Sequence, residues 1–302
     1  MRAKKISKIL VIASIIVLIA LCRNWFIKNH SANSDAEIPA TNEENNISDY
    51  SNITKEINTP GALKVENIFY KDDQYSEIKS ANIIKLTNEE RQSNGGLGEL
   101  AENIKLDQSA KEKVEDMFKK QYFEHISPTK VGVGDLAQEN GYEYITIGEN
   151  LVLGNFENEK DLINAWMNSP GHRANILNNK YSEIGVYAKK GMFKGKEVWL
   201  AVQHFGLSLS ICPQIDENLK TKIDIDQKEA DELSTKLEDL KTGLEEDSMM
   251  MYVYGSKKQQ AVEEYNKLAE EYNNLVKKIK SEIDEYNRQV QLLNNCIREK
   301  LS

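Results

Sequence analysis

The sequence predicts an α+β domain followed by an all-α extension. Three helix-like segments come first, and two strand-like runs follow them before the character of the chain changes at Pro213. Helices followed by a pair of strands are typical of α+β domains, in which helices pack in layers on a sheet. After Pro213, apolar residues recur at spacings of three and four, which favours a helical hairpin or a coiled coil. The length of 302 residues suits about two domains.

The three helix predictions depend on apolar residues that recur on one face. The first helix begins near Ile83 and ends at Asn94-Gly95-Gly96, because adjacent glycines favour a turn. The second follows through "DQSAKEKVEDMFKKQYF". Its apolar face consists of Ala110, Val114, Met117, Phe118 and Tyr122. The third covers about residues 159–168, with Trp166 among its inward residues.

Two strand-like runs close this domain. They are "EIGVYA", from Glu183 to Ala188, and "EVWLAVQHF", from Glu197 to Phe205, with a Lys- and Gly-rich turn between them. In the second run His204 alternates with apolar residues, so we expect it to be a strand residue that faces one layer of the domain. Gln203 then lies on the opposite face.

The C-terminal region carries two apolar stripes with heptad-like spacing. The first contains Leu233, Leu237, Leu240 and Leu244. The second runs from Tyr265 to Ile297 with one extra four-residue step. The shorter stripe can cover only part of the longer one. We therefore expect self-association or a protein partner at the uncovered part, near Ile297.

The first residues form a targeting signal. Basic residues precede an uncharged apolar run from Ile9 to Cys22, as in export signals. The run is shorter than the roughly 20 residues of a membrane span. However, "RNWFI" extends it, and no small-residue cleavage site follows it. Residues 1–28 are therefore either a cleaved signal peptide or a signal anchor in the cell membrane. The basic flank places the N-terminus inside and the rest of the chain outside the cytoplasm.

Composition divides the remainder of the chain. Residues 29–80 are polar and rich in Asn, Ser and Glu, so we expect a linker that is disordered over its first part. Residues 81–209 hold the α+β domain, and residues 210–302 hold the helical region. The net charge of −9, without clustered Lys and Arg, argues against a nucleic-acid partner. Cys212 and Cys296 are the only cysteines after the apolar run, so we expect no disulfide scaffold.

Three polar residues beside turn-forming residues are candidates for a functional site. His125 follows the second helix and precedes a Ser-Pro pair, and His172 follows a Pro-Gly pair at the start of a new short helix. Glu149 lies between a glycine and an asparagine, a turn signal. A helix N-terminus opposes protonation of His172, and a neutral imidazole binds metal or accepts a proton. We expect the three side chains to meet across a cleft.

The motifs around these residues resemble a known family. "YFEHISP", "GENL" and "WMNSPGHRANIL", followed by "EIGVYA" and "VWLAVQHFG", resemble the bacterial branch of the CAP superfamily, over about residues 83–206. The resemblance implies a three-layer α-β-α sandwich with an open cleft, where two His and two Glu can hold a divalent metal. His125, Glu149 and His172 match three of those positions. The fourth falls on Ser169, so one carboxylate is missing.

Three functions are compatible with this sequence. The first is an exported binding module with His125, Glu149 and His172 in its cleft. The second is a metal-dependent hydrolase of peptide or cell-wall material, because two imidazoles, a carboxylate and water form a known catalytic set for Zn²⁺. The third is a structural protein in which the coiled coil acts and the CAP domain is a spacer. The missing carboxylate favours binding over hydrolysis. No catalytic residue is assigned, and zinc or another divalent metal is the only cofactor expected.

Overall fold

The computed structural model describes residue 47 and residues 55–65, 77–246 and 255–302. The predicted signal segment, residues 1–28, lies outside the described residues, as does most of the linker. Among the described helices, none combines the length and the apolar character that crossing a membrane requires.

A mixed sheet forms the middle layer of the α+β domain. Its three long strands are β4 (Tyr144–Gly154), β5 (Glu183–Phe193) and β6 (Lys196–Ser208), and β6 pairs antiparallel with both of the others. Three short strands add to the sheet in parallel. These are β1 (Glu56–Asn58) and β2 (Leu63–Lys64) on β4, and β3 (Ala101–Glu102) on β5. The strand order is β1-β4-β6-β5-β3, with β2 also on β4.

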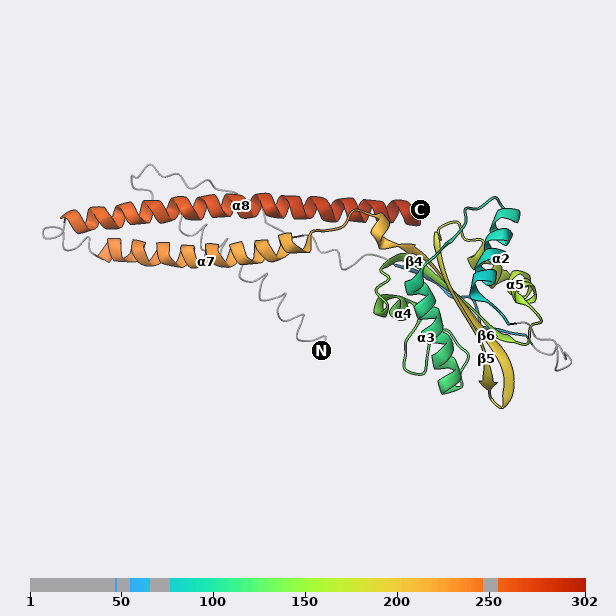
Figure 1. The fold of residues 1–302 in the computed structure, drawn as a ribbon. Helices are drawn as coiled ribbons and strands as arrows, with labels where there is room; N and C mark the ends of the chain where they lie inside the picture. The colour runs from blue at the N-terminus through green and yellow to red at the C-terminus, as the bar shows by residue number, and fades with distance from the viewer. Residues whose placement is uncertain (1–46, 48–54, 66–76, 247–254) are drawn as a thin grey trace. The chain divides into compact units, whose positions relative to one another are not determined.

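Helices cover both faces of the sheet and confirm the α-β-α layers (Figure 1). One face carries α2 (Ser80–Ser93), α5 (Glu159–Asn168) and α6 (Pro170–Ile176). The other carries α3 (Ile104–Lys120) and α4 (Val133–Glu139). Trp166 of α5 is completely buried in the first core, and Met117 of α3 is completely buried in the second. The α2, α3 and α5 helices therefore occupy the segments that apolar periodicity predicted.

Two strand assignments correct the sequence analysis. The predicted turn at Glu149 is wrong, because this residue lies in the middle of β4 and is buried. Residues 55–65 fall within the predicted polar linker, but they contribute β1 and β2 to the sheet. Pairing at a sheet edge uses backbone groups, so the segment needs no buried apolar side chains to bind there.

Two long helices follow the domain: α7 (Glu217–Glu246) and α8 (Gly255–Leu301). Ion pairs of 2.7 Å join Lys222 to Glu282 and Lys278 to Asp226, and their crossed numbering shows an antiparallel pair. The second apolar stripe is buried from residue 279 to residue 297. The expectation of an uncovered stripe near Ile297 is wrong, since Ile297 packs with residues of the α+β domain, including Ile145 and Leu207.

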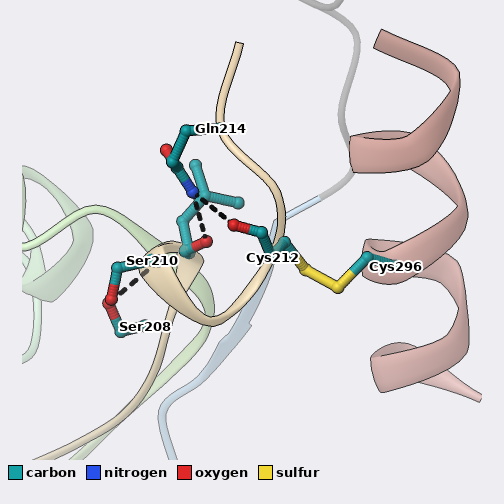
Figure 2. The surroundings of a disulfide bond; sticks show 6 residues. Ser208, Ser210, Cys212, Gln214 and Cys296 are labelled. Atoms are coloured by element: carbon teal, nitrogen blue, oxygen red, sulfur yellow. Dashed lines mark hydrogen bonds between the residues drawn. A yellow bond between two sulfur atoms is a disulfide. The ribbon is translucent and has the colours of Figure 1, made fainter. Parts of the chain in front are cut away.

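A disulfide ties the end of α8 to the α+β domain. Cys212 follows η1 (Leu209–Ile211), and it bonds to Cys296 with a sequence separation of 84 residues (Figure 2). In the chain-entropy account, closing a loop of this size contributes roughly 4–5 kcal/mol to the free energy of unfolding. The core is therefore supplemented by one covalent link that the sequence analysis did not expect.

Candidate functional site

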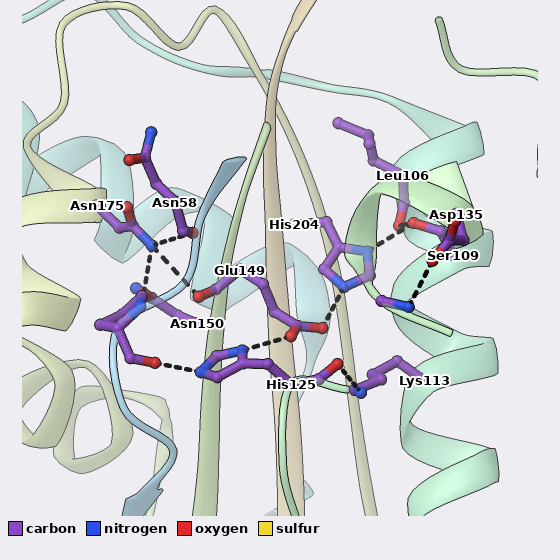
Figure 3. Close-up of polar contacts among 12 residues, drawn as sticks. Asn58, Leu106, Ser109, Lys113, His125, Asp135, Glu149, Asn150, Asn175 and His204 are labelled. Atoms are coloured by element: carbon purple, nitrogen blue, oxygen red, sulfur yellow. Dashed lines mark hydrogen bonds and ion pairs between the residues drawn. The ribbon is translucent and has the colours of Figure 1, made fainter. Parts of the chain in front are cut away.

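Glu149 is the centre of the site. It pairs across the sheet with His204 of β6, so the two side chains lie on the same face. Its Oε1 is 2.6 Å from Nδ1 of His125, and its Oε2 is 2.9 Å from Nε2 of His204 (Figure 3). Burial alone would raise the pKa of Glu149, but bonds from both imidazoles and the charge of Lys113 lower it to about 2. The carboxylate is therefore a fixed anion.

His125 lies in the loop after α3. That helix ends at Gln121, whose left-handed backbone (φ 57°) turns the chain back toward the sheet. Nζ of the buried Lys113 donates to the carbonyl oxygen of His125 at 2.5 Å. Nδ1 of the ring faces the Glu149 carboxylate, and Nε2 contacts the carbonyl oxygen of Pro60. Each ring nitrogen therefore faces an oxygen acceptor, and these two contacts fix the orientation of the ring.

His204 is a site residue that the sequence analysis did not include. Alternation correctly placed it on one face of a strand, opposite Gln203. Its Nε2 meets Glu149, while its Nδ1 is 2.6 Å from Oγ of Ser109 in α3. The signal that could have found it is the register between β4 and β6, which sets Glu149 opposite His204. That register joins residues 55 positions apart in the chain, so no local motif contains it.

His172 lies in the first turn of α6 and is 2% exposed. Burial and then the charge of His125 lower its pKa to about 4, against the effect of the Leu151 carbonyl. Its Nδ1 is 2.8 Å from Oγ of Ser169. Its Nε2 is buried without a hydrogen-bond partner among the described residues. The structure therefore joins His125 to Glu149 directly, whereas His172 bonds to neither within the described part of the chain.

A second polar pair lies behind the first. Asn150 pairs across the sheet with Gln203, on the face toward α2 and α6. Nδ2 of Asn150 donates to the His172 carbonyl oxygen at 3.1 Å and to Oε1 of Gln203 at 3.2 Å. Gln203 in turn donates to Thr87 of α2 at 2.7 Å. This amide network connects the first turn of α6 to the strand that carries Glu149.

The metal site expected from His125, Glu149 and His172 does not match this arrangement. Both oxygens of Glu149 already accept from imidazoles, and Nε2 of His125 is directed at Pro60. Of the three expected side chains, only His172 has a ring nitrogen, Nε2, without a hydrogen-bond partner among the described residues. Among the described residues, no group of three or more His, Cys, Asp and Glu is placed to hold a metal ion. The residues as arranged do not fit the ion, and zinc binding stays a prediction.

Comparisons with known proteins agree with the architecture. The model of the cysteine-rich secretory protein family, CAP, matches residues 84–205. The protein YkwD of Bacillus subtilis (strain 168) is 43% identical over 110 residues, which are 36% of this chain and 42% of YkwD. The membrane protein YlbC of the same organism is 30% identical over 118 residues, which are 38% of this chain and 34% of YlbC. The chain thus spans less than half the length of either relative.

Among solved structures, an extracellular protein containing an SCP domain from Bacillus anthracis is similar to this chain. The two share 29% identity with a TM-score of 0.36, over 42% of this chain and 39% of the other. The motifs around His125, Glu149 and His172 all fall inside the segment that the family model matches. Residues 84–205 are therefore a CAP domain of the bacterial type.

Proposed function

We propose that the CAP domain is an extracytoplasmic binding module whose ligand contacts the polar site around Glu149. The observation that carries this proposal is the pair of contacts from His125 and His204, which hold both carboxylate oxygens of Glu149. The pKa of Glu149 is about 2 and that of His172 is about 4, so neither group changes charge near pH 7. A general acid or base works best with a pKa near the operating pH. A carboxylate that these contacts hold in its ionised form favours recognition over proton transfer by Glu149.

A cavity beside the site supports ligand binding. Its volume is about 210 Å³, and it lies between α3 and the loop that follows. Its lining residues include Lys113, Asp116, Lys120, Tyr122, Ser127 and Thr129. Lys113 connects the cavity to the site, because it donates to the backbone of His125. Charged and hydroxyl groups at one opening suit a polar ligand.

The test compares binding with cleavage on the same sample. Residues 29–302 are mixed with purified peptidoglycan and with a peptide digest, with and without Zn²⁺. Bound protein is measured by co-sedimentation, and cleavage products by mass spectrometry. We expect retention without new products, and loss of retention in Glu149→Gln but not in the exposed control Glu99→Gln. Neither retention nor cleavage would contradict the binding proposal.

The second candidate is a metal-dependent hydrolase, and one observation favours it. Nε2 of His172 is buried and has no hydrogen-bond partner in the described part of the chain, so it is an atom that a metal could use. Zn²⁺-dependent products in the same experiment would support hydrolysis. Calorimetric titration with Zn²⁺ of the parent and of His172→Ala provides a direct check, since only a shared metal site predicts a difference between them. The third function, a structural role for the helices, predicts that residues 210–302 determine self-association.

The proposed location depends on the N-terminal signal and on the relatives. One similar structure is of an extracellular protein, and YlbC is described as a membrane protein. We expect residues 29–302 outside the cytoplasm, either released or attached through residues 1–28. Protease added to intact cells should then remove the CAP domain. Protection from that protease until the cells are lysed would contradict this location.

A further inference from the structure

Residues 55–65 lie along the edge of β4 that does not pair with β6, and they pass the candidate site. Before the site, Glu56 pairs with Thr146 and Asn58 with Gly148. After the site, Leu63 pairs with Val152, and the backbone N–H of Val65 donates to the Leu153 carbonyl at 2.9 Å. Between these two pairings the register leaves out Glu149, Asn150 and Leu151 of β4. The segment is therefore an added parallel strand that is interrupted beside Glu149.

The side chains of the site bind the backbone of this segment. Nε2 of His125 contacts the carbonyl oxygen of Pro60, and Nδ2 of Asn175 donates to the carbonyl oxygen of Asn58 at 3.3 Å. None of the segment's side chains is buried, and Ile57 is 52% exposed. Leu63 and Val65 in addition pack against the core under α2, α5 and α6. In a strand added to a sheet edge, backbone contacts provide affinity and packed side chains provide sequence preference.

Glycines leave the room that the segment occupies. A Cβ added to Gly171 of α6 would lie 2.7 Å from Cβ of Pro60, and its three nearest neighbours all belong to Pro60. A Cβ added to Gly154 of β4 would lie 3.0 Å from Cβ of Val65. Gly171 has no left-handed backbone and lies within a helix, so its own conformation does not require glycine. The close approach of Pro60 is a physical reason for a residue without a side chain.

From these contacts we propose that the β4 edge is a binding site for an extended peptide, which adds as a parallel strand over Glu149, and that residues 55–65 occupy it as an internal substitute. The inference rests on the proposed binding function and names its ligand class. Tethering gives the internal segment an effective concentration in the millimolar range. An external peptide must therefore compete with this effective concentration, or the internal segment must first be released from the β4 edge.

Cutting the tether tests this proposal in the full exported chain. A protease site is placed between residues 65 and 77, and the chain is cut after folding. The probe is the labelled peptide KEINTPGALKV, which has the sequence of residues 55–65. Fluorescence anisotropy then measures its binding before and after cutting, with a scrambled peptide as the control. We expect saturable binding below about 1 mM after cutting, and at least tenfold weaker binding before it.

A matched pair of variants identifies the groove. Gly171→Leu places a side chain where Pro60 lies, whereas Gly98→Leu enters open space. In Gly171→Leu we expect peptide affinity after cutting to fall at least tenfold, and hydrogen exchange over residues 55–65 of the uncut chain to rise. Gly98→Leu should change neither measurement.

Two results would overturn the inference. If the cut chain unfolds when the segment leaves, residues 55–65 are a permanent part of the fold. If the cut chain stays folded but does not bind the peptide, the groove does not accept a peptide in trans. Peptidoglycan retention measured on the same cut chain separates this failure from that of the proposed function, since retention without peptide binding would leave the binding module intact.

Discussion

Two neighbouring cross-strand pairs of β4 and β6 carry different kinds of polar contact. Glu149 and His204 face α3 as a charged carboxylate and an imidazole, whereas Asn150 and Gln203 face α2 and α6 as neutral amides. All four side chains are completely buried. The amides satisfy one another and the backbone, while the carboxylate depends on two imidazoles and a nearby lysine. The difference indicates that the amide pair depends on neutral hydrogen bonds alone, whereas the charged pair depends on keeping Glu149 ionised.

The largest effect should come from Glu149→Ala. The substitution leaves His125 and His204 without the anion that both contact. Removing one partner of a buried ion pair costs about 3–5 kcal/mol. We expect the free energy of unfolding, measured by denaturant titration, to fall by that amount. The exposed control Glu99→Ala should stay within about 0.5 kcal/mol of the parent. A loss below about 1 kcal/mol would contradict the central role of Glu149.

The next effect concerns pH, and it follows from the lowered pKa of His172. In the folded chain this pKa is about 4, against 6.5 for a free histidine. As pH falls from 6.5 toward 4, His172 binds a proton in the unfolded chain but not in the folded chain. The free energy of unfolding therefore decreases by about 3 kcal/mol. Denaturant titrations between pH 4 and pH 6.5 should show that the free energy of unfolding decreases with falling pH in the parent and decreases less in His172→Gln. An unchanged slope would show that His172 is not the group responsible.

Glu149 also loses its contribution to the free energy of unfolding as pH falls, but it does so at lower pH than His172. Its folded pKa of about 2 lies under the ordinary 4.5, so its contribution is complete above pH 4.5 and is lost as pH falls toward 2. The amide pair has no such dependence, because neither Asn150 nor Gln203 titrates. The pH response therefore comes from His172 and Glu149 and not from the amide pair itself.

A smaller effect is expected from Asn150→Ala on the neutral face. The change leaves the His172 carbonyl and Gln203 without a donor, and a buried unsatisfied group costs about 1–3 kcal/mol. We expect the loss in the free energy of unfolding to be the same at pH 5 and pH 8. A loss that varies with pH by more than about 1 kcal/mol would show that the amide and charged pairs are coupled.

The sequence predicted the layers better than the site. Helix periodicity located α3 and α5, and alternation assigned His204 and Gln203 to opposite faces. The local pattern did not predict β4, because Gly-Glu-Asn is typical of a turn. Pairing with distant strands decides the structure of this segment instead. The contact between His204 and Glu149 depends on that same pairing.

Other features carried no local signal at all. Cys212 and Cys296 are 84 residues apart, and only the packing of α8 against the domain brings them together. The segment around Pro60 has the pattern of a polar linker because it pairs with β4 through its backbone, and only a few of its side chains, including Leu63 and Val65, pack against the core. The family motifs supplied His125 and Glu149, whose side chains the structure places in direct contact.

The smallest expected effect tests how far the charged side extends into α3. Oγ of Ser109 lies 2.6 Å from Nδ1 of His204 and 3.0 Å from the Leu106 carbonyl oxygen. Its single hydrogen can go to only one of them, so either His204 is neutral and accepts it, or His204 is charged and donates to Ser109. Ser109→Ala should lower the free energy of unfolding by about 1 kcal/mol, the usual net value of one hydrogen bond, with the exposed Ser93→Ala as control.

Nitrogen chemical shifts of the His204 ring distinguish the two states: a neutral ring keeps its hydrogen on Nε2, facing Glu149, in both proteins. A charged ring would instead lose the Nδ1 hydrogen when Ser109 is removed, because that nitrogen would have no acceptor left. A loss above about 3 kcal/mol would show that Ser109 belongs with the charged pair, whose contacts would then extend from β6 into α3.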